Sequence, residues 1–311
     1  MSRKKKITYS AIIPVYNSER IVGVTISETI KFFNKHRFNY ELIIINDGSS
    51  DKSWDILKNI ASKNTRIKAI NLLRNYGQHT AVYCGLQKST GDYVITLDDD
   101  MQNPPNEIIH LINKANENYD VVFGKYRIKK QSLYRRLGSF IVNSINKKIF
   151  DIPDGIVTTN FRIIRRDVVS RVCEYKTNYP YVQGLIMMCS SNPANVLVKH
   201  KARKIGNSNY NIIKITTLVA RILFNYSSYP LRLTSIIGIL FSILSFILGI
   251  YYFLRAIILG SSVPGWATIA VMISFFDGIT LLMLGMLGEY TIRLLNQVSL
   301  RKSYYIKEEV N

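Results

Sequence analysis

The stretch Gly91 to Pro105 reads GDYVITLDDDMQNPP and decides the fold. Its first part, Asp92 to Leu97, is a short apolar run with the composition of a buried strand. Three consecutive acidic residues, Asp98 to Asp100, follow at once, and Pro104-Pro105 stiffen the exit and can begin a helix. In α/β proteins the functional loops follow the carboxyl ends of parallel strands. The stretch therefore predicts a strand with a functional site at its tip.

Around this stretch, short apolar runs alternate with segments of helical length. The expected strands are Ile7 to Pro14, Tyr40 to Asn46, Ile67 to Leu72, Asp92 to Leu97 and Asp120 to Phe123. The expected helices between them are Glu19 to Asn34, Ser53 to Ser62, His79 to Lys88 and Pro105 to Glu117. This alternation predicts an α/β fold, a mostly parallel sheet with right-handed crossovers and flanking helices. Polar clusters at Asn17, at Asp47-Gly48-Ser49 and at Asp98 to Asp100 then fall beyond three strand ends.

Composition separates a polar part of the chain from an apolar part. The 311 residues carry a formal net charge of +20, which implies an anionic partner: nucleic acid, a phosphorylated substrate or an acidic membrane face. Because the chain also contains two long apolar segments that predict membrane spans, we favour the interpretation that this positive charge lies beside a membrane. Nucleic acid is the less favoured partner. Three scattered cysteines fit a reducing compartment. Met1 to Lys6 is a short basic tail without a signal core, so we expect the catalytic part to stay in the cytoplasm.

Two long apolar segments predict a transmembrane hairpin. Leu233 to Leu254 has no charged residue, and Trp266 to Leu287 is interrupted only by Asp277. Asp277 is either a functional intramembrane group or, as we favour, an interhelical or intersubunit hydrogen-bonding group. Positive charge concentrates outside the pair, which places both ends in the cytoplasm of a multi-pass inner-membrane protein. Asn211 to Phe224 has the apolar face of an interfacial amphipathic helix.

These features predict four regions: a cytosolic catalytic domain at residues 1–208, an amphipathic helix at 209–230, a transmembrane hairpin at 231–292 and a cytosolic tail at 293–311.

The acidic triplet has the ligand chemistry of a divalent cation site. Asp98 and Asp100 are alternate residues that point the same way in an extended chain, and Gln102 follows at the same spacing. Hard oxygen ligands of this kind hold Mg²⁺ or Mn²⁺ through one or two carboxylates. An isolated Asp-x-Asp pattern is more often a turn or a cap. The metal site is favoured because further motifs accompany it.

Those motifs are IPVYN at Ile13 to Asn17, NDGSSD at Asn46 to Asp51 and LRNYGQHTA at Leu73 to Ala81. In order and spacing they resemble the family-2 glycosyltransferases, which have the Rossmann-like GT-A fold. KARKIGNSNY at Lys201 to Tyr210 and GMLGEYTIRLL at Gly285 to Leu295 extend the resemblance over the whole chain. It is strongest to the polyprenyl-phosphate branch, which includes the dolichol-phosphate mannose synthases and the bacterial undecaprenyl-phosphate 4-deoxy-4-formamido-arabinose transferases.

The resemblance implies a role for particular residues. The nucleotide would be bound by Pro14, Tyr16, Asn17, Asp47, Gly77 and Asp98. The metal would be held by Asp98, Asp100 and Gln102. The donor or lipid phosphates would be bound by Arg127, Arg162, Arg203 and Ser208, with the arginines neutralising their charge. Asp98, Asp100 and Arg162 are the catalytic candidates. His79 and Cys84 lie in or near the motifs and are assigned no catalytic role.

The sequence departs from the family pattern at two positions. Asp99 stands where an alanine is common, and we expect it to point away from the metal. Thr158-Thr159-Asn160 stands where many members carry Gly-Asp or Asp-x-Gly, which leaves the acceptor-side catalytic residue open, with Asp154 as a substitute.

The predicted function is transfer of a sugar, with inversion, from a nucleotide-sugar, with UDP favoured, to a polyprenyl phosphate such as undecaprenyl phosphate. The product would serve cell-envelope glycan synthesis or lipid A modification, and the resemblance implies a homotetramer. Two alternatives stay open: a processive polysaccharide synthase and a catalytically inactive membrane scaffold. The first normally has a Gln-x-x-Arg-Trp element, whereas neither Trp54 nor Trp266 follows an arginine.

Overall fold

The computed structural model describes residues 6–126, 144–175, 177, 179–201, 219–220, 222–224, 226–259, 265–298 and 302–311. The chain divides into two compact units. One comprises Met1–Asn211 together with Lys302–Asn311, and the other comprises Ile212–Arg301.

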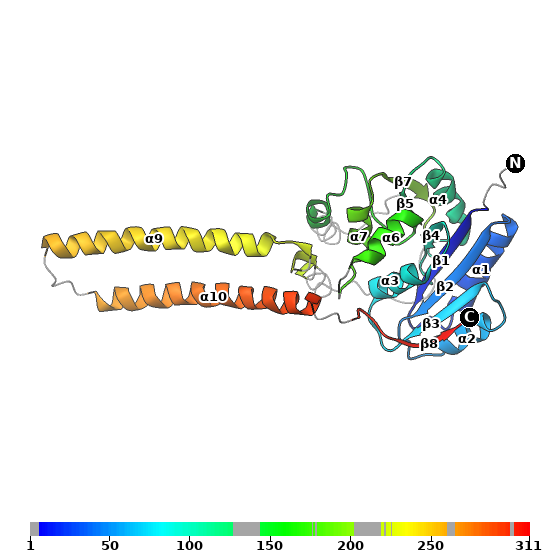
Figure 1. The fold of residues 1–311 in the computed structure, drawn as a ribbon, viewed down its shortest axis with the longest axis horizontal. Helices are drawn as coiled ribbons and strands as arrows, with labels where there is room; N and C mark the ends of the chain where they lie inside the picture. Colours follow the sequence, from blue (N-terminus) through cyan, green and yellow to red (C-terminus); the bar gives the residue numbers. More distant parts are fainter. Residues whose placement is uncertain are drawn as a thin grey trace. The chain divides into compact units, whose positions relative to one another are not determined.

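The first unit is built on one mixed sheet in the strand order β7-β5-β6-β4-β1-β2-β3-β8 (Figure 1). Its strands are β1 (Thr8–Val15), β2 (Asn39–Asn46), β3 (Ile67–Leu72), β4 (Tyr93–Thr96), β5 (Val121–Tyr126), β6 (Arg162–Arg165), β7 (Pro193–Val198) and β8 (Ile306–Val310). The pairs β1–β2, β1–β4, β2–β3 and β5–β7 are parallel. The pairs β4–β6, β5–β6 and β3–β8 are antiparallel. The expected mostly parallel sheet with flanking helices is therefore present.

Helices cover both faces of this sheet. They are α1 (Val22–Lys35), α2 (Ser53–Ala61), α3 (Gln78–Lys88), the 3₁₀ turn η1 (Pro105–Glu107) with α4 (Ile108–Ala115), α6 (Arg166–Glu174) and α7 (Val182–Cys189). Alternate residues of β1 and β2 pack into one cluster with α1, α2 and α4. On the other face α3 approaches so closely that a Cβ on Gly85 would lie 2.5 Å from the side chain of Ile12. Ile43, Ile44 and Ile45 are fully buried, which is why β2 is an uninterrupted apolar run.

The expected strands and helices are found within a few residues of their predicted bounds. The strand expected at Ile67 to Leu72 agrees with β3, and the helix expected at Pro105 to Glu117 is divided into η1 and α4. The sequence did not predict β6, β7 or β8, nor the helices α6 and α7. Two of these strands, β6 and β8, pair only antiparallel, so they lie outside the strand–helix repetition on which the prediction was based.

The C-terminal residues form an edge strand of the first unit rather than a free tail. β8 pairs with β3 over Ala69↔Val310 to Leu72↔Ile306. The indole Nε1 of Trp54 donates a 3.0 Å hydrogen bond to Glu308. β8 therefore covers the edge that β3 would otherwise expose.

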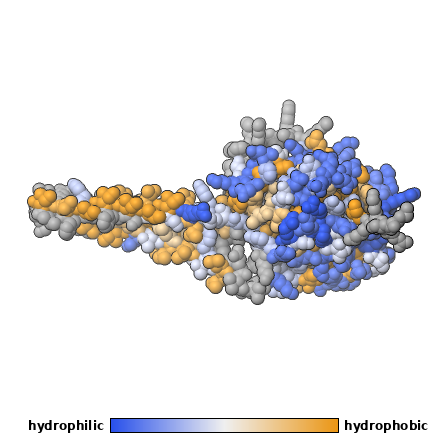
Figure 2. Space-filling model, turned by 45° about the horizontal axis from the view of Figure 1, so that its top comes forward, coloured by the Kyte–Doolittle hydropathy of each residue, from blue (hydrophilic) through white to orange (hydrophobic). Residues whose placement is uncertain are grey.

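The second unit contains two long helices, α9 (Tyr229–Leu259) and α10 (Trp266–Val298), which lie side by side (Figure 1). The rings of Phe241 and Phe275 are 5.4 Å apart, and a Cβ on Gly238 would lie 2.3 Å from Met283. Apolar side chains cover much of the surface of the pair (Figure 2).

Within the described residues, one stretch of α10, Phe275–Ile292, is long and apolar enough to cross a membrane, and Tyr229–Phe241 of α9 is a shorter apolar stretch. The predicted spans lie within α9 and α10. Most of the predicted interfacial helix lies outside the described residues.

Candidate active site

A cavity of about 410 Å³ opens at the carboxyl ends of β1, β2 and β4. Because parallel strands end at the same edge of a sheet, residues that follow all three strands meet there. The residues that line the cavity are Pro14, Val15, Tyr16, Ser18, Asp47, Asn75, Gly77, Gln78, Asp98, Asp99, Asp100 and Asn160. Five of the six residues predicted to bind the nucleotide are among them, and Asn17 is not.

The acidic triplet lines this cavity just beyond β4. Oδ1 of Asp98 accepts a 2.6 Å hydrogen bond from Nε2 of Gln78 and a 3.5 Å one from Nδ2 of Asn160. Burial, followed by the charges of Asp100 and Asp99, raises the pKa of Asp98 to about 6. Three carboxylates in one cavity thus create a demand for positive charge.

Asp99 is hydrogen-bonded through both its side chain and its backbone. Its Oδ2 accepts a hydrogen bond from the hydroxyl of Ser18, and its backbone oxygen accepts a 2.7 Å bond from Oγ1 of Thr25. Burial raises the pKa of Asp99 above its usual value. These bonds tie the middle of the triplet to α1 and to the segment that precedes it.

The donor set fits a divalent cation that also binds substrate oxygens. Among the described residues, no group of three or more His, Cys, Asp and Glu side chains has the arrangement of a complete metal site. Mg²⁺ is often bound by one or two carboxylates together with substrate phosphates, so Asp98 and Asp100 are the side chains that could hold such a cation. Gln102 does not line the cavity, and its backbone oxygen accepts a 2.8 Å hydrogen bond from the amide of Lys201.

Asp47 shapes the wall of the cavity. It is 3% exposed, and its two carboxylate oxygens accept 2.8 Å hydrogen bonds from the backbone amides of Tyr76 and Gly77. Burial raises the pKa of Asp47 although both hydrogen bonds lower it. The neighbouring Gly48 has φ +62°, and a Cβ there would lie 2.4 Å from the carbonyl carbon of Arg74. The loop that carries Gly77 is therefore packed directly on the end of β2.

Asn17 joins the loops that follow β1 and β2. Its φ is +51°. Its backbone N–H donates to Oγ of Ser49 at 2.9 Å, and its side-chain Oδ1 accepts from the backbone N–H of Ser50 at 2.9 Å. The structure thus places Asn17 beside the cavity as a loop contact.

Arg162 lies in the interior and does not line the cavity. It is 1% exposed, Nη1 donates to the backbone oxygen of Thr159 at 3.3 Å, and the buried Nε has no hydrogen-bond partner among the described residues. Burial lowers the pKa of Arg162 to about 10, although the charge of Asp98 acts to raise it. Arg162 therefore stays a cation whose charge acts on Asp98 from inside the protein.

His79 and Cys84 are placed as structural residues. Burial and then the charge of Arg162 lower the pKa of His79 to about 4, and its ring packs edge-on to Tyr181 at 4.9 Å. Burial raises the pKa of Cys84 to about 11, which keeps the thiol protonated.

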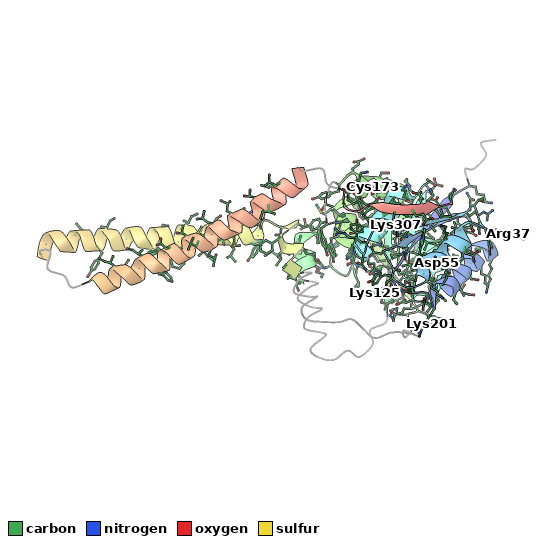
Figure 3. The ribbon with its side chains drawn as sticks, turned by 90° about the horizontal axis from the view of Figure 1, so that it is seen from below. Arg37, Asp55, Lys125, Cys173, Lys201 and Lys307 are labelled. Carbon is green, nitrogen blue, oxygen red and sulfur yellow. The ribbon has the colours of Figure 1, made fainter. Side chains whose placement is uncertain are left out.

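The remaining predicted phosphate ligands, Arg127, Arg203 and Ser208, lie outside the described residues. Lys125 and Lys201, which precede the two arginines by two positions, are part of the first unit (Figure 3). Asp154 is fully exposed and pairs with Lys147 at 2.8 Å. It does not line the cavity.

Sequence reasoning did not assign four polar residues of the cavity wall: Ser18, Asn75, Gln78 and Asn160. Asn75 and Gln78 belong to the LRNYGQHTA motif, so their position in this motif is the sequence signal that could have indicated a place in the cavity wall. Asn160 belongs to Thr158-Thr159-Asn160, where the sequence departs from the family pattern.

Comparison with known proteins places this geometry in a family. The model of the family described as Glycosyl transferase family 2 matches residues 10–173. The chain is 33% identical over 314 residues to the undecaprenyl-phosphate 4-deoxy-4-formamido-L-arabinose transferase of Proteus mirabilis, covering 100% of this chain and 96% of the relative. It is 33% identical over 304 residues to the enzyme of that name from Photorhabdus laumondii, covering 97% and 94%.

Among solved structures, glucosyl-3-phosphoglycerate synthase from Mycobacterium tuberculosis, in complex with Mn²⁺, UDP and phosphoglyceric acid, superimposes with a TM-score of 0.53. The identity is 15%, and the match covers 70% of this chain and 76% of the other. This likeness shows that the two proteins share a fold.

Proposed function

The chain belongs to glycosyl transferase family 2 and is a glycosyltransferase; from that premise we propose that it transfers a sugar from a UDP-sugar to undecaprenyl phosphate. The observation that carries the proposal is the cavity in which Asp98 and Asp100, at the tip of β4, face the Asp47 loop. Two relatives that match nearly the whole chain are named as undecaprenyl-phosphate 4-deoxy-4-formamido-L-arabinose transferases, which supports the acceptor in this proposal.

The donor would bind with its nucleoside along Pro14, Tyr16 and the Asp47 loop, and its diphosphate beside the triplet. Asp98 and Asp100 would hold a divalent cation, Mg²⁺ or Mn²⁺, which neutralises the diphosphate as it leaves. Arg162 adds a fixed buried charge behind the carboxylates. Among the described residues, no basic side chain lines the cavity, which supports a role for a cation there.

The acceptor needs little activation. A phosphate monoester has a second pKa of about 6 and is largely dianionic near neutral pH, so its oxygen can attack without a strong general base. One oxygen of the lipid phosphate forms a bond to the anomeric carbon while the bond from that carbon to the diphosphate oxygen breaks. UDP leaves and the anomeric configuration inverts. The protein contributes position, exclusion of water and electrostatic stabilisation.

The second unit would anchor the enzyme in the membrane that holds its acceptor. We propose that α9 and α10 form a transmembrane hairpin, that residues 209–230 lie at the interface and that the first unit is cytoplasmic. The apolar stretch Phe275–Ile292 and the exposed apolar side chains of both helices support this arrangement. A role in cell-envelope glycan synthesis or lipid A modification would follow from such an acceptor.

The test is a transfer assay. The full chain in nanodiscs is incubated with undecaprenyl phosphate, Mn²⁺ or Mg²⁺ and a panel of UDP-, GDP- and CDP-sugars, and lipid products are identified by mass spectrometry. We expect one lipid-linked sugar per acceptor from a UDP-sugar, loss of product with EDTA and recovery with added metal. A ladder of longer products would instead indicate a processive synthase. The absence of both lipid product and donor hydrolysis would indicate a scaffold.

Matched variants separate chemistry from folding. Asp100→Asn should lower transfer by at least about 100-fold, because it removes a carboxylate from the site of charge compensation. Asp55→Asn changes an exposed aspartate of α2, labelled in Figure 3, and should leave transfer unchanged. Equal activity of the two variants would contradict the proposed role of the triplet.

A further inference from the structure

A continuous chain of side-chain hydrogen bonds connects Asn146 with Asp98. Nδ2 of Asn146 donates to the hydroxyl of Tyr181 at 3.0 Å, and that hydroxyl donates to Oε1 of Gln183 at 3.1 Å. Nε2 of Gln183 donates to Oδ1 of Asn160 at 3.1 Å, and Nδ2 of Asn160 donates to Oδ1 of Asp98 at 3.5 Å. We call these five residues the amide relay.

The fold places the last two members of the relay opposite each other. β4 and β6 are antiparallel with Thr96 paired to Arg162, so two further steps along the same register bring Asp98 to Asn160. The hydroxyl of Thr96 also donates a hydrogen bond to the backbone oxygen of Asn160. The position of Asn160 is thus set by the sheet, although the residue lies 62 positions from Asp98 in the sequence.

The direction of the relay follows from the chemistry of its last member. An ionised carboxylate only accepts hydrogen bonds, so Asn160 must turn its amide nitrogen toward Asp98 and its oxygen toward Gln183. Gln183 must then turn its nitrogen toward Asn160 and its oxygen toward the hydroxyl of Tyr181. Reversing any of these amides would place two acceptors, or two donors, face to face. The charge of Asp98 therefore orients the relay, and the relay in turn holds Asp98.

The far end of the relay is buried and closely packed. Tyr181 is 3% exposed and Asn146 is 6% exposed. The ring of Tyr181 packs against Phe150 at 5.5 Å, and a Cβ on Gly184 would lie 2.3 Å from that phenyl ring. Such packing leaves little room for alternative rotamers at this end.

The relay has a consequence for the oxygen that Asp98 offers to a ligand. Within the described part of the chain, the two hydrogen bonds to this carboxylate come from Gln78 and Asn160, and both end on Oδ1. Oδ2 is left as the oxygen available to a cation. A hydrogen bond from an amide to one carboxylate oxygen of Asp98 restricts the rotamer of this side chain, and that rotamer directs the other oxygen toward the cation.

We propose that Asn160 is a positioning residue for Asp98, held in its working orientation by Gln183 through the amide relay. The inference rests on the proposed function, because it assigns the relay to the carboxylate that would hold the cation.

The variant Gln183→Glu tests the relay without altering the cavity wall, since Gln183 is not among the lining residues. Glutamate still accepts from the Tyr181 hydroxyl but cannot donate to Asn160, so the amide of Asn160 should turn its oxygen toward Asp98. We expect kcat to fall by about 10–100-fold, the range typical of lost outer-shell partners, with the donor KM changed less than about threefold. The affinity for Mn²⁺ alone, titrated by electron paramagnetic resonance, should fall with it.

Three controls make the result specific. Gln87→Glu, an exposed residue whose Oε1 accepts from the Tyr304 hydroxyl, should change neither kcat nor Mn²⁺ affinity, because glutamate keeps that acceptor. Gln183→Met removes the donor without adding charge and should lower both. In an Asn160→Ala background, Gln183→Glu should lower kcat and Mn²⁺ affinity by less than about a further threefold. A double-mutant cycle requires this when one residue acts through the other.

Wild-type kcat and Mn²⁺ affinity in Gln183→Glu, or an undiminished effect of that change in the Asn160→Ala background, would overturn the inference. A wild-type protein that transfers no sugar would refute the proposed function. In that case the Mn²⁺ titration still decides whether the relay positions Asp98.

Discussion

Replacing Asp47 by asparagine tests whether the side of the cavity proposed to bind the nucleotide is held together by one carboxylate. Each oxygen of Asp47 accepts one backbone amide, from Tyr76 or from Gly77, at 2.8 Å, and the side chain is 3% exposed. Asparagine keeps one acceptor, and its NH₂ group then faces a backbone N–H. One charge-assisted hydrogen bond is lost and one donor is left unpaired, which together cost about 3 kcal/mol.

A loss of this size is measurable by thermal unfolding. For a unit of this length about 3 kcal/mol corresponds to a fall in Tm of roughly 6–12 °C. Because Gly77 and Asn75 line the cavity, the donor KM should also rise, by about tenfold or more. Differential scanning fluorimetry and initial rates against donor concentration supply both values, with the exposed Asp55→Asn as the matched control.

The outcome that refutes this reasoning is an Asp47→Asn protein whose Tm and donor KM equal those of Asp55→Asn. A changed KM with an unchanged Tm would mean that Asp47 acts on the nucleotide directly and not through the loop.

Three further outcomes are expected. Gly48→Ala should lower the free energy of unfolding by about 2–5 kcal/mol in chemical denaturation, because the new Cβ meets the Arg74 backbone at 2.4 Å and φ is positive; a loss below 1 kcal/mol would contradict this. His79 has a pKa of about 4 in the folded protein and 6.5 ordinarily, so as the pH falls the unfolded chain binds a proton first, and stability decreases between pH 6.5 and pH 4. His79→Asn should flatten the curve of Tm against pH in that window. A curve parallel to that of the wild type would refute this. Deleting residues 302–311 should lower Tm and cause aggregation in size-exclusion chromatography, because it removes β8 and exposes β3; a monodisperse, equally stable product would show that the strand is dispensable.

The parallel half of the sheet was predictable because its signals are local. YELIIIN at Tyr40 to Asn46 is a buried parallel strand by composition alone, and β2 (Asn39–Asn46) covers it. The acidic triplet was predictable for the same reason, since it directly follows an apolar run. The bounds of α1 differ more, by three residues at its start, because Glu19 to Ile21 carry no capping side-chain hydrogen bond that marks the first turn.

The antiparallel strands could not be predicted in this way. β8 reads IKEEV, five residues with two glutamates, and it becomes a strand only because β3 offers an edge and Trp54, Lys58 and Lys88 offer partners for those glutamates. β6 has only four residues. Asn160 acquires its position from the pairing of β4 with β6, which joins residues as far apart in the sequence as Thr96 and Arg162 and which no local pattern encodes. The burial of Arg162 follows from the same pairing, so its side chain could not be placed from the motif alone.

The order in which the strands are made adds a constraint on biogenesis. The ribosome finishes seven strands of the sheet before α9 and α10, and supplies β8 only after both helices have been synthesised. The edge of β3 therefore stays uncapped while both apolar helices are synthesised and, in the proposed transmembrane arrangement, inserted into the membrane. Nascent chains arrested at residue 301 should be protease-sensitive at β3 and protected once Ile306–Val310 has emerged, which would make completion of the sheet a checkpoint on successful insertion.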